Sequence, residues 1–123
     1  MKKTLTFVVD DTVPSMNRMS RGSHWPYTRA KKLWTATFAG ALWEAGARSS
    51  TPFNSVKASA ELTFPTRHRR DLDNYWLTGK ALGDALYGGG LISDDTPEFY
   101  EFTGLRFNPI RGRPKTVVTL ETT

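Results

Sequence analysis

The chain has 123 residues, close to the commonest size of a single domain, and its 38% hydrophobic residues are typical of a globular protein. It has no cysteine and two histidines, His24 and His68, which excludes disulfides, thiolate zinc sites and thiol nucleophiles. Any metal would bind mainly to oxygen ligands, which favours Mg²⁺, Mn²⁺ or Ca²⁺. The net charge of +5 suits a polyanionic partner such as nucleic acid, although many basic proteins do not bind one.

The sequence contains no apolar run of membrane-spanning length, and its first residues lack the apolar stretch of a signal peptide. We therefore expect a cytoplasmic protein that has no membrane partner. We also expect one domain over residues 1–123 and no small-molecule cofactor.

The first half of the chain predicts a strand at 4–9, a polar loop at 14–26, a helix at 28–46 and a strand at 56–64. Thr28 is the expected N-cap of the helix, and Gly46 its expected stop. In the later strand, the apolar residues alternate with polar ones from Val56 to Phe64, which indicates one buried face and one wet face.

The second half predicts a helix from about Asp73-Asn74 to Tyr87, followed by strands at 98–107 and 116–121. Three glycines at 88–90 end the helix, and a basic turn at 108–115 joins the two strands. The order of elements indicates an α/β fold: a single compact domain with a mixed sheet of about four strands and two main helices.

The predicted second helix has two different faces. One face presents Asp73, Lys80 and Asp84, and the other packs through Tyr75, Leu82 and Leu86. Gly79 and Gly83 lie four residues apart on the packing side, which indicates a close approach by another backbone.

Carboxylates gather around this helix. Asp71 and Asp73 precede it, and Asp94-Asp95 follow it. Three carboxylates without histidine suit a hard cation, which binds a scissile phosphate and activates a water. Lys80 would neutralise charge that develops on the phosphate.

Asp71 and Asp73 also have two interpretations other than a magnesium site. The pair can form surface ion pairs with Arg67, Arg69 or Arg70, which contribute little stability. A calcium loop of the EF-hand kind is excluded, because Tyr75 and Trp76 occupy positions where it needs a ligand and a glycine.

Several motifs together resemble one family. They are Pro14-Ser15-x-Asn17-Arg18, Arg69-Arg70-Asp71-Leu72-Asp73-Asn74, Lys80-Ala81-x-x-Asp84-Ala85-Leu86 and Asp94-Asp95. In order and approximate spacing they resemble the RusA-like crossover-junction endodeoxyribonucleases, the Holliday junction resolvases of bacteria and their phages. The resemblance covers nearly the whole chain.

The resemblance implies metal-binding carboxylates at Asp71, Asp73 and Asp95, with Asp94 beside them, and a catalytic lysine at Lys80. It also implies a homodimer that uses Mg²⁺, with Mn²⁺ as a substitute, to place paired nicks in a four-way DNA junction. One departure concerns the lysine. The family pattern has it three residues after the asparagine, where this chain has Leu77, and Lys80 follows about one helical turn later.

Other basic residues are candidates for DNA contact, namely Arg67, Arg69, Arg70, Arg18, Arg21, Lys32, Arg111, Arg113 and Lys115. His24, Trp25 and Tyr27 either stack on an opened base or cover the edge of the core. The predicted core includes Trp34, Phe38 and Trp43, and Asp10-Asp11 is interpreted as a strand-end turn.

Two rival functions remain. A related nuclease would cut flaps, single strands or other branched DNA with the same site. A non-catalytic module would bind branched DNA without a metal-dependent product, but pure binding gains nothing from carboxylates that face phosphate.

Overall fold

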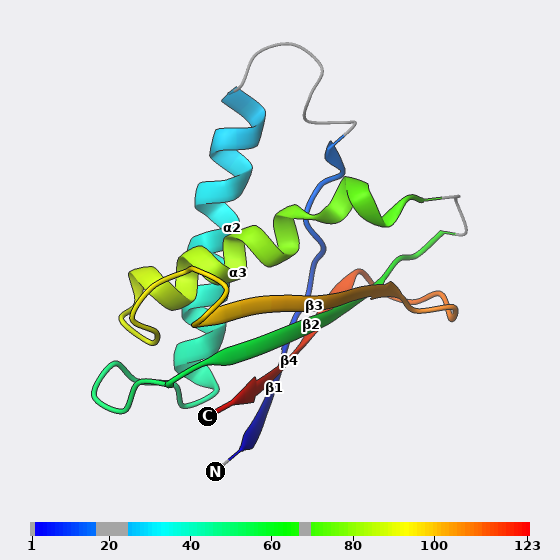
Figure 1. The fold of residues 1–123 in the computed structure, drawn as a ribbon. Helices are drawn as coiled ribbons and strands as arrows, with labels where there is room; N and C mark the ends of the chain where they lie inside the picture. Colours follow the sequence, from blue (N-terminus) through cyan, green and yellow to red (C-terminus); the bar gives the residue numbers. More distant parts are fainter. Residues whose placement is uncertain (1, 17–24, 67–69) are drawn as a thin grey trace.

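The computed structural model describes residues 2–16, 25–66 and 70–123. Its elements follow the predicted order (Figure 1): β1 (Lys3–Val9), α2 (Trp25–Glu44), β2 (Val56–Thr63), a short 3₁₀ helix η1 (Leu72–Tyr75), α3 (Leu77–Gly88), β3 (Tyr100–Phe107) and β4 (Lys115–Thr122). The predicted strands agree with these bounds to within about two residues, the usual uncertainty at the ends of an element.

The strands form one mixed sheet in the order β1-β4-β2-β3. Strand β4 pairs antiparallel with both β1 and β2, and β2 pairs parallel with β3. The parallel pair needs a crossover connection, which α3 provides. The predicted fold, a single compact α/β domain with a four-stranded mixed sheet and two helices, is therefore confirmed.

Both helices cover the same face of the sheet. Phe7 of β1 is paired through the sheet with Val118 and Ala60, and its ring contacts Phe38 of α2. On the neighbouring row of the same face, the Phe102 ring of β3 lies against Gly79 of α3. The core lies between this face and the two helices.

The opposite face of the sheet is formed by small and polar side chains. One row across the strands contains Thr6, Thr119, Ser59 and Gly104. Neither α2 nor α3 packs on this side, so the alternation predicted for β2 is confirmed, with Val56, Ala58, Ala60 and Leu62 buried on the helix side.

Helix α2 differs from the prediction at its beginning. Thr28 lies inside the helix, so the prediction that it is the N-cap was wrong. Pro26 occupies the first turn, where its missing N–H is not required. The predicted stop is confirmed, because α2 ends at Glu44 and Gly46 adopts φ +98°.

Helix α3 begins later than predicted. Asp73 and Asn74 lie in η1, and α3 starts at Leu77. The N–H of Asn74 donates to the carbonyl oxygen of Asp71 at 3.1 Å, which closes a tighter turn. The predicted single helical face with Asp73, Lys80 and Asp84 is therefore correct only for Lys80 and Asp84.

Gly79 and Gly83 are closely packed, but the prediction that another backbone approaches them was wrong, because their neighbours are the aromatic rings of β3. A Cβ at Gly79 would lie 2.6 Å from Phe102, and one at Gly83 would lie 2.7 Å from Tyr100. Among the predicted core residues, Trp34 and Phe38 are buried. Trp43 is 62% exposed, so that prediction was wrong: it lies in the last turn of α2, and the Arg48 guanidinium stacks over its ring.

Neither described helix combines the length and the apolar character that a membrane crossing requires.

Candidate metal and nucleic-acid site

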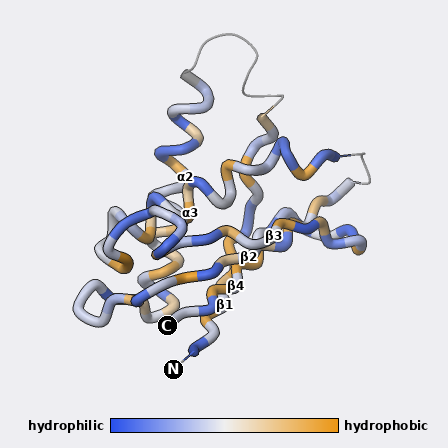
Figure 2. Tube along the Cα trace, in the orientation of Figure 1, coloured by the Kyte–Doolittle hydropathy of each residue, from blue (hydrophilic) through white to orange (hydrophobic). Residues whose placement is uncertain are grey.

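Asp71 and Asp73 are both exposed at the point where the chain enters η1. Asp71 has an extended backbone (φ −98°, ψ 132°), and its side chain caps no helix N–H. Figure 2 shows this entry as a strongly hydrophilic stretch beside the hydrophobic beginning of α3. Neither carboxylate is used in holding η1 in place.

Aromatic contacts hold η1 instead. The buried ring of Tyr75 packs against Phe64 at 5.3 Å and Phe107 at 5.6 Å, measured between ring centroids. The next residue, Trp76, packs against Tyr27 of α2 at 5.7 Å. These contacts attach η1 to the end of the sheet and to α2, which leaves its aspartates free to face solvent.

Of the three arginines that were expected to pair with Asp71 and Asp73, Arg70 lies within the described residues. This side chain donates hydrogen bonds to the backbone oxygen and the hydroxyl of Thr66, at 3.0 and 2.8 Å, and its guanidinium lies over the Phe64 ring. The ion pairs that join described residues are Lys31–Asp84, Lys80–Asp84 and Arg106–Glu61. None of these pairs includes a candidate metal ligand.

Asp94 and Asp95 lie in the loop after α3. The N–H of Asp95 donates to the Asp94 carboxylate at 2.7 Å, so this contact shapes the loop. Figure 1 shows the loop at the opposite end of α3 from η1, and a 12-residue helix spans about 18 Å. Over the described ranges, no three carboxylates or imidazoles come close enough to hold one ion. The structure therefore does not bring Asp95 to Asp71 and Asp73 within one chain.

The residues at η1 fit a magnesium ion of a particular kind. Mg²⁺ usually keeps several waters and binds through one or two carboxylates together with substrate phosphates, rather than in a complete protein cage. Asp71 and Asp73 are exposed and belong to none of the ion pairs among described residues, as such a site requires. A site of three carboxylates does not fit the described part of one chain, and the metal site stays a prediction.

Lys80 is exposed on α3, and its ammonium lies 3.6 Å from the Asp84 carboxylate four residues later. Lys31 of α2 lies 3.3 Å from the other carboxylate oxygen of Asp84, a contact that the sequence did not predict. The only available signal was the position of Lys31 in a basic stretch of an amphipathic helix, which does not identify its partner.

Tyr100 lies next to this group on the sheet side. Its hydroxyl donates to the carbonyl oxygen of Gly79 at 2.7 Å. Burial, and then the neighbouring Asp84 carboxylate, raises the pKa of Tyr100 well above its ordinary value. The hydroxyl therefore keeps its proton and stays a hydrogen-bond donor.

The remaining basic candidates lie in several places. Lys32 is exposed on α2, Arg111 and Arg113 are exposed in the loop between β3 and β4, and Lys115 is half-buried at the beginning of β4. Because Tyr75 contacts Phe107, the β3–β4 loop begins beside η1. Arg18, Arg21, His24, Arg67 and Arg69 lie outside the described residues.

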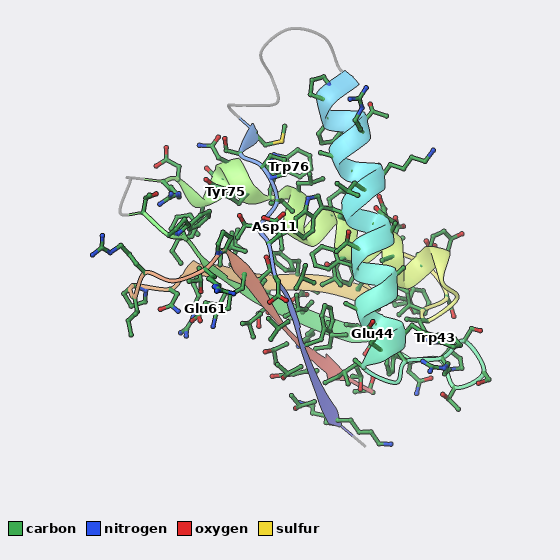
Figure 3. All side chains as sticks on the ribbon, turned by 180° about the vertical axis from the view of Figure 1, so that it is seen from behind. Asp11, Trp43, Glu44, Glu61, Tyr75 and Trp76 are labelled. Carbon is green, nitrogen blue, oxygen red and sulfur yellow. The ribbon has the colours of Figure 1, made fainter. Side chains whose placement is uncertain are left out.

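A cavity of about 460 Å³ adjoins η1, with Asp11, Ser15, Trp34, Phe64, Arg70 and Tyr75 in its wall. Figure 3 shows Asp11 on the same side of the molecule as Tyr75 and Trp76. Asp11 accepts a hydrogen bond from the N–H of Thr12, which confirms a strand-end turn. Asp11 and Arg70 line the same cavity because the tertiary fold brings the end of β1 to η1.

No protein-family model matches this chain, and a search of curated proteins found no match either.

Proposed function

We propose that this protein is a RusA-like, magnesium-dependent endonuclease that resolves four-way DNA junctions by paired nicks. One observation supports the proposal most. Asp71 and Asp73 are exposed and directly follow Arg70 in the chain, yet they are absent from the ion pairs among described residues. Carboxylates in that position repel a DNA backbone unless a cation lies between them and the phosphate.

Asp71 and Asp73 are the residues that would hold Mg²⁺. When bound, the ion would supply an activated water and charge stabilisation at the scissile phosphate. Lys80 neutralises charge that develops on the phosphate oxygens, since its ammonium is exposed on α3, the helix that directly follows η1. Lys32, Arg111 and Arg113 hold the DNA arms through their phosphates, with Arg70 beside η1.

The proposed enzyme acts as a homodimer. A four-way junction has two-fold symmetry, and a two-fold dimer presents two equivalent sites to it. Paired nicks require one site for each of two strands, so a single protomer cannot produce them in one encounter.

The decisive experiment mixes the protein with an end-labelled synthetic four-way junction, in magnesium or in chelator. Magnesium-dependent paired nicks are expected on the junction and not on linear duplex. Asp73→Asn removes a ligand charge with little change in size and abolishes the nicks. Glu101→Gln is the matched control, because Glu101 is exposed on the sheet face away from the helices, and it cleaves like the wild type.

Further variants separate the roles within the site. Lys80→Ala lowers cleavage and spares junction binding, and unchanged turnover would remove Lys80 from the mechanism. Asp95→Asn tests the third carboxylate, and normal cleavage would exclude it from the metal site. Tight binding without cutting, also in manganese, would instead identify a non-catalytic branched-DNA module. Preferential cutting of flaps would identify a nuclease for another branched substrate.

A further inference from the structure

Two lysines from different helices share one carboxylate. The ammonium of Lys31 on α2 lies 3.3 Å from one oxygen of Asp84, and that of Lys80 on α3 lies 3.6 Å from the other. The two lysine side chains are 36% and 44% exposed. Partly exposed ion pairs of this kind contribute little stability, so both ammonium groups can turn to a stronger anion at small cost.

The charges in this group do not balance. Two ammonium groups face one carboxylate, which leaves an excess positive charge between α2 and α3. A shallow groove of about 480 Å³ continues from it, lined largely by alanines and glycines of the two helices, and among the described residues of its wall Asp84 is the only acidic one. Its other polar residues are Lys31, Lys32, Thr28 and Thr35, all from α2. Ammonium and hydroxyl donors without matching carboxylates suit the phosphates of a nucleic-acid strand.

The groove begins at Asp84 and runs along α3 toward Gly88 and Gly89, away from η1, and α2 links Asp84 back to the candidate site. Tyr27 of α2 packs on Trp76, which lies directly between η1 and α3. One helical turn later on α2, Lys31 reaches Asp84. Helix α2 therefore follows α3 from the aspartates of η1 to the shared carboxylate, and Lys80 lies between the two.

We infer that Lys31 binds a DNA phosphate beside the scissile one, whose developing charge Lys80 neutralises, and that Asp84 is a positioning residue that holds the two ammonium groups side by side. This inference rests on the proposed function, because Lys80 is the lysine of the nuclease site. It adds Lys31 to the DNA-contact surface, next to Lys32 on α2, and it assigns a role to Asp84.

The first test measures binding of the uncut four-way junction in chelator, over a range of salt concentrations. Each neutralised phosphate contributes about 0.9 to the slope of log K against log salt. Lys31→Ala is expected to weaken binding and to lower the slope by about one phosphate contact. Lys57→Ala is the matched control, because Lys57 is exposed on the sheet face away from the helices, and it keeps the wild-type slope. Lys31→Arg restores the slope.

The second test uses Asp84→Asn, which keeps the size of the side chain and removes its charge. Binding in chelator becomes tighter, because a carboxylate no longer repels the phosphates. In magnesium, kcat falls while KM falls or stays constant, since the Lys80 ammonium is no longer held. Thermal unfolding confirms that both variants are folded, and a merely structural role of Asp84 would not tighten binding.

The results also separate this inference from the proposed function. If Lys31→Ala keeps the wild-type salt slope, or if Asp84→Asn binds the junction more weakly, the inference is overturned. The proposed nuclease function is not affected by either result. If the protein binds the junction with the expected salt slopes but does not cleave it in any metal, the proposed nuclease function is overturned. The phosphate contact of Lys31 is then supported. Failure of the wild-type protein to bind the junction in chelator overturns both.

Discussion

The Tyr100 hydroxyl illustrates how a single buried group depends on pH. It donates to the carbonyl oxygen of Gly79, and its pKa is raised by burial and then by Asp84. Because the pKa in the folded state lies above the unfolded value of about 10, the unfolded chain loses this proton first. The corresponding stability is fully present below about pH 10 and is lost as the pH rises further.

We predict that Tyr100→Phe makes stability less sensitive to alkali. Near neutral pH the variant loses one hydrogen bond, about 1 kcal/mol of unfolding free energy. Above about pH 10 the difference in unfolding free energy between the variant and the wild type shrinks. The unfolded wild-type chain then loses the Tyr100 proton, which the folded protein retains, and this favours unfolding of the wild type alone. Denaturant unfolding across this pH range measures the difference. A constant gap at all pH values would contradict the raised pKa.

At the level of elements, two aromatic side chains of β3 pack directly against the glycines of α3. The rings of Tyr100 and Phe102 lie where side chains at Gly83 and Gly79 would project. This approach places Asp84 over the sheet edge and within reach of Lys31 on α2. The two glycines therefore determine the distance between α3 and the sheet, and with it the position of Lys80.

We predict that Gly83→Ala destabilises the protein by about 1–3 kcal/mol, because the new methyl group overpacks against the Tyr100 ring. Gly40→Ala is the matched control in the other helix, where a Cβ meets nothing within 4 Å. The control is expected to stabilise the protein by about 0.5–1 kcal/mol, the helix preference of alanine over glycine. Denaturant midpoints measure both changes, and equal shifts would show that α3 can move away from β3.

At the level of the whole molecule, one core joins the sheet to both helices. Phe38 is fully buried at its centre, where its ring contacts Phe7 of β1 and Trp34 of α2. Figure 3 shows Trp43 at the end of the same helix, away from that centre. Two aromatic residues of α2 thus make very different contributions to the stability of the fold.

We predict that Phe38→Ala lowers the unfolding free energy by about 3–5 kcal/mol, which is a large part of the stability of a small domain. Trp43→Ala loses its contact with Arg48 and costs about 1 kcal/mol. Chemical denaturation measures both values. If Trp43→Ala lost as much unfolding free energy as Phe38→Ala, the exposed tryptophan would have a partner in solution.

Local structure was predicted most accurately from the sequence where a single local rule applies. Alternation in β2 fixes which side chains are buried, because successive residues of a strand face opposite sides. Gly46 and Gly90 end their helices at positive φ, which glycine adopts most easily. The start of α3 was predicted wrongly, since Asp73 is a good N-cap by composition but the contacts of Tyr75 favour a 3₁₀ turn.

The sequence by itself determined the α/β class, the order of elements, the lack of cysteine ligands and the order and spacing of the aspartate and lysine residues. These properties depend on residue type and on local spacing. The tertiary structure alone decided that Asp71 and Asp73 lie at one end of α3 and Asp95 at the other, and that Lys31 shares Asp84 with Lys80. Such relations depend on how separate elements pack, because contacts between distant residues follow from the shared core and not from any local pattern.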